Sequence, residues 1–186
     1  MSYEKDAMNN GNIPDKVTTL ARDIRLLALD VDGVMSDGRL YFDNQGEEIK
    51  AFNTLDGLGL KLLMKSGVRV ALITGRTSQI VADRARNLGI DLVFQGRDDK
   101  KVVLDGILET LRLDYSTVAY AGDDLPDLAC ITAAKLGVTV PDAHFLVRDA
   151  ADAVTVRAGG AGAVREICDW ILLAQGNFDT AVSPFR

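Results

Sequence analysis

Two aspartates, Asp30 and Asp32, stand one residue apart at the end of an apolar run and are followed by Gly33. The run from Leu26 to Leu29 is typical of a short, fully buried strand. Because side chains at i and i+2 on an extended chain point to the same side, both carboxylates should project together. Two adjacent negative charges repel each other, burial raises that cost, and a bound divalent cation would offset both penalties. The pair therefore predicts a hard-metal site that also carries a nucleophile.

Polar groups also follow three later strands of the expected sheet: Thr74, the region of Lys100, and the pair Asp123 and Asp124. Taken alone, each has an ordinary structural explanation, as a helix start, a solvated face or a common turn. Their placement at successive strand ends favours one shared site, because open α/β sheets bind ligands at the carboxyl ends of their strands.

The elements that must position these residues alternate between strand and helix. Apolar and strand-prone runs predict strands over 24–30, 68–73, 91–94, 117–121, 136–140 and 153–156. Helical patterns fall over 17–25, 58–67, 76–88, 99–111, from 126 onwards and over 163–174. Two further strand-prone runs, 38–42 and 48–52, flank an Asp/Asn/Gly-rich turn and predict a β-hairpin. We expect an α/β fold, a single Rossmann-like three-layer α/β/α domain with a parallel sheet and a β-hairpin insertion.

The composition fits one globular domain and argues against several functions. The 186 residues are 47% hydrophobic, and no apolar run reaches membrane-spanning length. The net charge of −6 argues against non-specific nucleic-acid binding, which depends on lysine and arginine. Cys130 and Cys168 are expected to be small core residues in a reduced cytoplasm, and the lone His144 to be structural or to support the site from outside its first contacts. We expect a flexible N-terminal tail over 1–20, a core domain over 21–176 and a C-terminal tail over 177–186.

The order of these motifs resembles that of the haloacid dehalogenase superfamily, whose members are phosphotransferases with an aspartate nucleophile. The matching motifs are Asp30-Val31-Asp32-Gly33-Val34, Thr74, Lys100 and Gly122-Asp123-Asp124. The resemblance implies that Asp30 is the nucleophile and that Asp32 is the general acid and base. It places Mg²⁺ on Asp30, on the main-chain carbonyl of Asp32 and on Asp123.

The same resemblance gives supporting roles to other residues. Thr74 would hydrogen-bond a phosphoryl oxygen, and Lys100 would neutralise the phosphate and orient the nucleophile. Lys101 competes with Lys100 for the latter role because the two are adjacent. Asp124 and Asp127 are expected to support the metal site from outside its coordination sphere.

Members of this superfamily that act on small substrates commonly insert a cap domain, and neither gap between the motifs is long enough here to hold one. A narrower resemblance is to the capless 3-deoxy-D-manno-octulosonate 8-phosphate phosphatases. It rests on Asp37–Tyr41, Phe52–Gly57, Ile73–Arg76, Pro141–His144 and Gly159–Glu166. This resemblance implies a Mg²⁺-dependent homotetramer in which neighbouring subunits complete each active site. The substrate contacts that it implies are Asp32, Asn53, Thr54, Leu55, Asp56, Gly57, Lys61, Arg76, Arg84 and Lys100.

Several alternatives stay open at this point. A nonulosonate 9-phosphate phosphatase, a catalytically silent partner of a sugar-nucleotide synthetase, and a protein or nucleic-acid phosphatase are rivals. Arg84 is either a substrate contact or part of a solvated helix face, and the hairpin is either an intersubunit element or an ordinary surface feature. The run Gly159–Gly162 is either a mobile lid that carries Arg165 toward the sugar acid or a flexible lead-in to the last helix.

Overall fold

The computed structural model describes residues 13–186, so part of the expected N-terminal tail, residues 1–12, lies outside the described range. Six parallel strands form the central sheet in the order β5-β4-β1-β6-β7-β8. Their bounds are β1 (Leu26–Leu29), β4 (Arg69–Ile73), β5 (Leu92–Phe94), β6 (Val118–Ala121), β7 (Leu136–Thr139) and β8 (Ala153–Val154). This arrangement confirms the predicted α/β class and places β1, which leads into Asp30, between β4 and β6.

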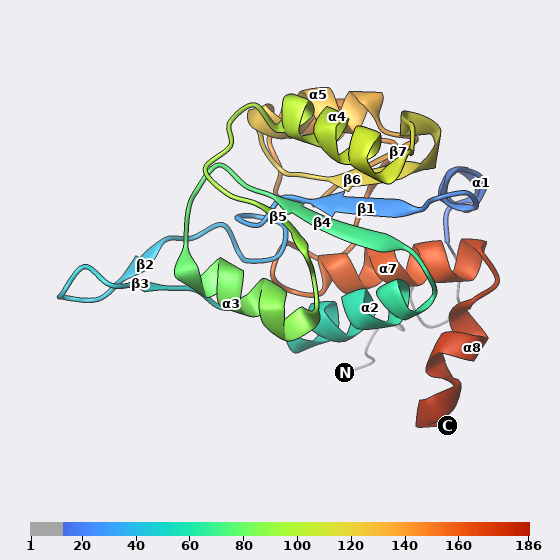
Figure 1. The fold of residues 1–186 in the computed structure, drawn as a ribbon, viewed down its shortest axis with the longest axis horizontal. Helices are drawn as coiled ribbons and strands as arrows, with labels where there is room; N and C mark the ends of the chain where they lie inside the picture. The colour runs from blue at the N-terminus through green and yellow to red at the C-terminus, as the bar shows by residue number, and fades with distance from the viewer. Residues whose placement is uncertain (1–12) are drawn as a thin grey trace, which may run out of the picture.

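Helices cover both faces of the sheet (Figure 1). One face carries α1 (Asp15–Ala21), α2 (Thr54–Lys65), α3 (Gln79–Leu88) and α7 (Ala163–Ala174). The other carries α4 (Lys100–Leu111), α5 (Leu128–Ala133) and α6 (Phe145–Ala150). Short 3₁₀ turns lie at η2 (Tyr115–Thr117), η3 (Leu125–Asp127) and η4 (Ser183–Phe185), and α8 (Phe178–Val182) follows α7. Within residues 13–186, each helix is too short or too polar to cross a membrane.

The central strand shows why its sequence is apolar without alternation. Leu27 and Leu29 join the core on one face of the sheet, while Leu26 and Ala28 join the core on the other. All four residues are fully buried. A parallel strand covered on both faces has no side that meets water, so every position is apolar until the chain reaches Asp30.

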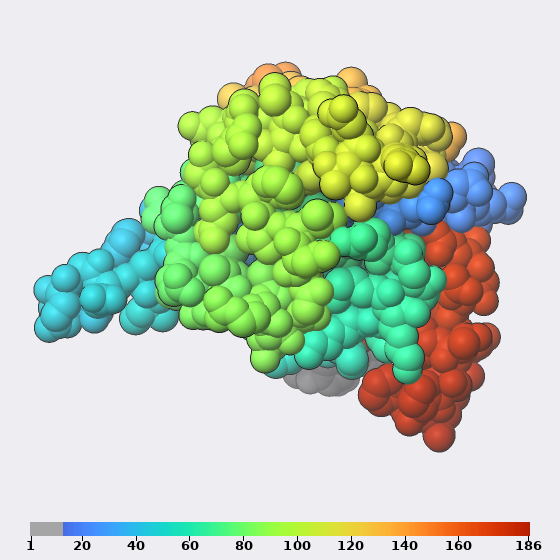
Figure 2. Space-filling view, in the orientation of Figure 1, coloured from blue at the N-terminus to red at the C-terminus, as the bar shows by residue number. Residues whose placement is uncertain are grey.

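The predicted hairpin is present but has short strands. β2 (Tyr41–Phe42) and β3 (Glu48–Ile49) pair antiparallel, and the hairpin extends away from the body of the molecule (Figures 1 and 2). The carboxylate of Asp43 accepts hydrogen bonds from the backbone N–H groups of Gln45 and Glu47, which stabilises the turn.

Helices occupy both ends of the described chain, and the helix predicted over 17–25 is present as α1, shifted toward the N-terminus. Residues 15–20 of the expected N-terminal tail belong to α1, which packs against α7 because Val17 and Ala21, one turn apart, are fully buried. In the expected C-terminal tail, Phe178 begins α8 and packs against the core, whereas Phe185 is exposed. Helix α6 was not expected from the sequence. It begins after His144, whose ring nitrogen Nδ1 accepts the backbone N–H of Leu146.

The Gly159–Gly162 run is packed against the backbone that follows Asp32. A Cβ atom on Gly159 would lie 1.8 Å from the carbonyl oxygen of Gly33, which leaves room only for hydrogen. The N–H of Gly160 donates to the carbonyl of Val34 at 3.0 Å. The glycines therefore serve a close approach of two backbone segments, which is neither the mobile lid nor the flexible lead-in expected from the sequence.

We expect Gly159→Ala to destabilise the protein by about 2–3 kcal/mol, because the added methyl group forces two backbone segments apart. Urea denaturation followed by circular dichroism measures the change. Gly106→Ala is the matched control, since a Cβ at this helical position in α4 meets nothing within 4 Å. That control should be neutral or stabilising by up to about 1 kcal/mol. Equal stabilities for the two variants would contradict the close-packing interpretation.

Candidate active site

The predicted chemical residues meet at the carboxyl edge of the sheet. Asp30 directly follows β1 and donates its backbone N–H to the carbonyl of Ala121, at the end of β6, at 2.9 Å. Thr74 follows β4, and Asp123 lies two residues beyond β6. Asp30 and Thr74 are buried, with 6% and 2% of their surface exposed, so the site is recessed into the end of the sheet.

A buried ion cluster surrounds Asp30. The ammonium group of Lys100, at the start of α4, lies 3.0 Å from Asp30 Oδ1 and 2.7 Å from Asp127 Oδ1. The hydroxyl of Tyr120 donates to the same Asp127 oxygen at 2.7 Å. The other oxygen of Asp127 accepts the backbone N–H groups of Asp123 and Asp124 at 3.3 and 3.4 Å. Asp127 therefore holds both the ammonium group of Lys100 and the turn that carries Asp123.

Two motif glycines make this close packing possible. A Cβ on Gly33, whose φ is +100°, would lie 2.1 Å from the Asp123 carboxylate. A Cβ on Gly122 would lie 2.2 Å from the carboxyl carbon of Asp127. The glycines of the first and fourth motifs thus leave space for the carboxylates of Asp123 and Asp127.

The electrostatics of the cluster reflect crowded negative charge. Burial, with the charge of Asp127, raises the pKa of Asp30 to about 6, although Lys100 opposes the rise. Burial, with the charges of Asp30 and Asp127, raises the pKa of Asp123 to about 8. Burial disfavours the charged form of Lys100, but the charges of Asp30 and Asp127 outweigh this effect and raise its pKa.

The same residues fit a divalent cation. One carboxylate oxygen from each of Asp30, Asp123 and Asp127 lies within 4.8 Å of the other two. Within residues 13–186, Asp123 Oδ1 is buried and has no hydrogen-bond partner, and the buried Asp30 Oδ1 has only the ammonium group of Lys100, at 3.0 Å. Both oxygens of Asp127 are already occupied by donors. Asp30 and Asp123 are therefore the pair with lone pairs to offer, and all-oxygen ligands suit Mg²⁺.

We expect the affinity for Mg²⁺ to rise with pH and to level off above about 8. The proton held by Asp123 must leave before a cation binds, so the apparent Kd should change by about tenfold per pH unit between 6 and 8. Below about 6 the dependence should steepen, because Asp30 is then protonated as well. Calorimetric titration of the metal-free protein measures this. A pH-independent Kd would contradict the proposed ligands, and Asp123→Asn should lose the binding.

The carboxylate of Asp32 contacts the hairpin and does not join that of Asp30 in the carboxylate cluster, in contrast to the shared projection expected from their spacing. One of its oxygens forms an ion pair with the ammonium group of Lys50, and the other lies 3.9 Å from the guanidinium of Arg76. Arg76 also pairs with Glu48 at 3.1 Å. Neither Lys50 nor Glu48 was indicated by the sequence motifs, nor was Tyr120. The alternation Glu48-Ile49-Lys50, with polar residues on one face of a strand, was the available signal.

The predicted sugar contacts at the start of α2 form a second group. The carboxylate of Asp56 is buried and accepts the backbone N–H of Arg165 at 2.8 Å, so it caps α7. The side-chain amide of Asn53 donates to the carbonyl of Gly160 at 3.2 Å. The guanidinium of Arg84 donates to the carbonyl of Asn53 at 3.3 Å and stacks over Phe52. Arg84 therefore reaches the neighbouring helix and is not simply part of a solvated face.

The remaining predicted residues are placed more simply. Thr54, Leu55 and Lys61 are exposed on α2, and Gly57 faces the Arg84 guanidinium, which a Cβ at this position would meet at 2.3 Å. Asp124 is exposed and caps η3 through the backbone N–H of Leu125. Lys101 pairs with Asp105 on the surface of α4, so Lys100 is the lysine that lies in the site.

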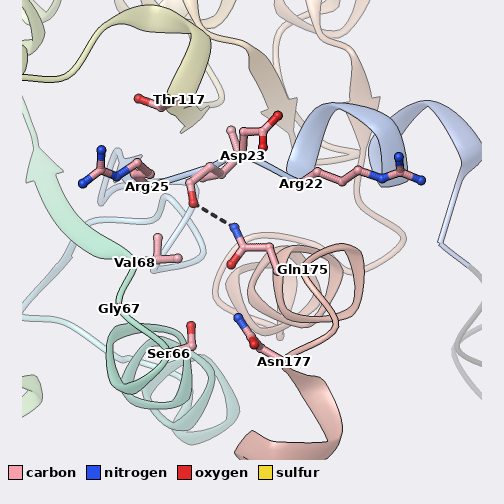
Figure 3. A pocket seen from close by; sticks show the side chains of 10 residues that line it. Arg22, Asp23, Arg25, Ser66, Gly67, Val68, Thr117, Gln175 and Asn177 are labelled. Carbon is pink, nitrogen blue, oxygen red and sulfur yellow. Dashed lines mark hydrogen bonds between the residues drawn. The ribbon is translucent and has the colours of Figure 1, made fainter.

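A hollow of about 490 Å³ lies at the amino ends of the strands, opposite the carboxylate cluster (Figure 3). Its lining residues are Arg22, Asp23, Ile24, Arg25, Ser66, Gly67, Val68, Thr117, Gln175 and Asn177. The amide of Gln175 donates to the backbone carbonyl of Ile24 at 2.8 Å, and Arg22 and Arg25 point to opposite sides (Figure 3). None of the predicted chemical residues contributes to this hollow, so we assign the chemistry to the carboxylate cluster.

Comparison with known proteins agrees with the motifs. No family model matches the chain. It is 49% identical over 171 residues to the 3-deoxy-D-manno-octulosonate 8-phosphate phosphatase KdsC of Salmonella typhi, covering 92% of this chain and 91% of that protein. A crystal structure of the corresponding phosphatase from Moraxella catarrhalis, in complex with magnesium ion, phosphate ion and a KDO molecule, matches with a TM-score of 0.91. Its identity is 44%, covering 94% of this chain and 100% of that chain.

A cobalt-bound form of the Haemophilus influenzae deoxy-D-mannose-octulosonate 8-phosphate phosphatase matches with a TM-score of 0.83. It is 39% identical and covers 87% of this chain and 94% of that chain. The sequence motifs, the fold and the carboxylate cluster therefore all agree with the same family. The chain belongs to the family of 3-deoxy-D-manno-octulosonate 8-phosphate phosphatases, as its motifs had indicated.

Proposed function

We propose that the protein hydrolyses 3-deoxy-D-manno-octulosonate 8-phosphate to the free sugar acid and inorganic phosphate. The observation that carries this proposal is the buried Asp30, paired with Lys100 and placed beside Asp123, in a member of this phosphatase family. A phosphate monoester carries the negative charge that such a centre is suited to bind, provided that a cation offsets the carboxylates.

The reaction takes place in two steps on the side chains of this chain. A carboxylate oxygen of Asp30 attacks phosphorus, and the bond between phosphorus and the sugar oxygen breaks as Asp32 gives that oxygen a proton. Asp32 then accepts a proton from water, which attacks phosphorus and breaks its bond to Asp30. The second step releases phosphate and restores both aspartates.

The surrounding groups supply charge and orientation. Lys100 balances the phosphoryl charge and holds Asp30, while Thr74 donates to a phosphoryl oxygen. Mg²⁺ held by Asp30, Asp123 and the main-chain carbonyl of Asp32 would polarise the phosphoryl group. Removal of the metal with EDTA should abolish turnover, and added Mg²⁺ should restore it.

Recognition of the sugar acid is assigned to cations at the rim. Arg76 retains an exposed fraction of 45% in its side chain, so it can still meet a ligand while it pairs with Glu48. Arg84 and the exposed Lys61 lie on α3 and α2, which cover the same face of the sheet. Lysine at position 61 gives a single charged contact, whereas arginine would bind a carboxylate with two parallel hydrogen bonds.

We also propose that the protein works as a cytoplasmic homotetramer. The hairpin presents Leu40, Tyr41, Phe42 and Ile49 to solvent, with 41–58% of each residue exposed. Apolar side chains grouped on a projecting arm favour contact with another subunit, and such a contact would close an uncapped site. Sedimentation of the wild type and of Phe42→Ser tests this, because loss of the tetramer should raise KM. A fully active monomer would remove the argument.

A phosphate-release panel tests the substrate. Octulosonate 8-phosphate, nonulosonate 9-phosphates and simple hexose phosphates are compared by kcat/KM at saturating Mg²⁺. We expect the octulosonate ester to exceed the hexose phosphates by at least about 100-fold, because only the sugar acids offer a carboxylate to the cationic rim. A higher value for a nonulosonate ester would assign the protein to that substrate instead. Loss of activity on all esters would support a catalytically silent partner.

A further inference from the structure

The return strand of the hairpin directs two charged side chains at the site. Positions 48 and 50 lie two residues apart and so face the same side of β3 and its extension, whereas Ile49 between them is exposed. The side chain of Lys50 is 2% exposed and that of Glu48 is 17% exposed. An almost fully buried ammonium group requires a partner, because burial of an unpaired charge is costly.

Lys50 finds that partner in Asp32. Its ammonium group forms an ion pair with Asp32 Oδ1, and it lies 3.7 Å from Glu48 Oε1. The hydroxyl of Ser36 lies 3.4 Å from the same Asp32 oxygen. The carboxylate of Asp32 is therefore oriented mainly from the hairpin, whereas Asp30 is oriented from α4 through Lys100.

Glu48 fastens the hairpin to the loop after β4. Its carboxylate accepts a hydrogen bond from the hydroxyl of Ser78 at 2.6 Å and pairs with Arg76 at 3.1 Å. Ser78 precedes α3 and is itself held by Gln95, which accepts its backbone N–H at 2.8 Å. The backbone that carries Lys50 is thus anchored two residues earlier, through Glu48. The position of the ammonium group is therefore set by the strand as well as by the flexible lysine side chain.

We propose that Lys50 is a positioning residue that holds Asp32 in line with the leaving oxygen, and that Glu48 anchors it. This inference rests on the proposed function, in which Asp32 gives a proton to the sugar oxygen. Without Lys50, the Asp32 carboxyl would be free to rotate toward Arg76 or water. The nucleophile Asp30 would keep its own partners. Loss of Lys50 should therefore impair proton donation more than it impairs the attack on phosphorus.

Leaving groups of different basicity separate these two effects. A sugar alkoxide needs a proton to depart, whereas 4-nitrophenolate is a stable anion that leaves without one. Single-turnover experiments with enzyme in excess measure release of the sugar acid or of 4-nitrophenolate, which reports formation of the phospho-aspartate alone. For Lys50→Met we expect about a 100-fold slower release from octulosonate 8-phosphate, and a loss of about threefold or less from 4-nitrophenyl phosphate.

Two further variants keep the test decisive. Glu48→Gln retains Lys50 but weakens its anchor, so a smaller loss of about tenfold, again confined to the sugar ester, is expected. Lys50→Arg should recover part of the lost rate because it restores a cation. If Lys50→Met does not fold, as judged by circular dichroism, the comparison of the two esters in Glu48→Gln decides.

Equal losses on both esters, or a change in KM alone, would overturn the positioning role and make Lys50 a substrate contact or a structural residue. The wild-type enzyme is measured in parallel. If it releases no sugar acid from octulosonate 8-phosphate, the proposed function itself fails, and the two failures are thereby distinguished.

Discussion

Replacing Asp30 with asparagine should lower kcat by about 10⁴-fold or more. An amide oxygen is a poor nucleophile toward phosphorus, and no other carboxylate has the same position, since Asp123 lies across the site and Asp127 is fully paired. Phosphate release from octulosonate 8-phosphate measures the loss. Trapping of the acid-stable phosphoenzyme should succeed with the wild type and fail with the variant.

The fold should survive this change, because an asparagine of the same shape removes negative charge from a crowded cluster. The matched control is Asp23→Asn, the same substitution at an exposed position on the opposite edge of the sheet, which should leave kcat unchanged. Appreciable turnover in Asp30→Asn, beyond that from spontaneous deamidation, would exclude Asp30 as the nucleophile.

Replacing Lys100 with methionine should damage both stability and catalysis. The ammonium group is the cation held between the buried carboxylates of Asp30 and Asp127, and its side chain is 4% exposed. Removing one partner from a buried ionic cluster typically costs about 3–5 kcal/mol in the free energy of unfolding. Loss of the charge that faces the phosphoryl group should also lower kcat, by about 10²–10³-fold.

Lys101→Met provides the matched control at the next position. Lys101 is partly exposed and pairs with Asp105 on the surface, so its removal should change stability by about 1 kcal/mol or less and leave kcat intact. Urea denaturation in EDTA measures stability without interference from bound metal. If Lys100→Met were as stable and active as Lys101→Met, the cluster would not have the role assigned to it.

Much of the fold was predictable because local pattern and global architecture agree in it. The strand that leads to Asp30 is buried on both faces, so its sequence is apolar throughout and easily recognised. The convergence of Asp30, Thr74 and Asp123 follows from the geometry of a parallel sheet, which brings strand ends to one edge. The family resemblance added the order of the motifs, and the comparisons confirm that family.

What the sequence did not reveal depends on contacts between distant segments. Lys50 was not recognised because its partner, Asp32, lies 18 positions earlier and belongs to a different element. The run Gly159–Gly162 indicated a mobile lid or a flexible lead-in, because the close approach of Gly159 to the backbone of Gly33 is visible only in the folded chain. The capping of α7 by the carboxylate of Asp56 was likewise not visible, because Arg165 lies 109 positions later. Contacts of this kind leave no periodic pattern in the local sequence, so they could not be predicted from it.

The pleat of β3 has an evolutionary consequence. Ile49 faces outward while its neighbours, Glu48 and Lys50, face the site, so three consecutive residues serve surface and catalysis alternately. An insertion or deletion of one residue here would exchange the two faces, presenting charge outward and an isoleucine to Asp32. Substitutions at position 49 can change the surface used for assembly without moving Glu48 or Lys50. A change in the length of this strand would move both. Drift in this hairpin should therefore proceed by substitution on the outer face and spare its register.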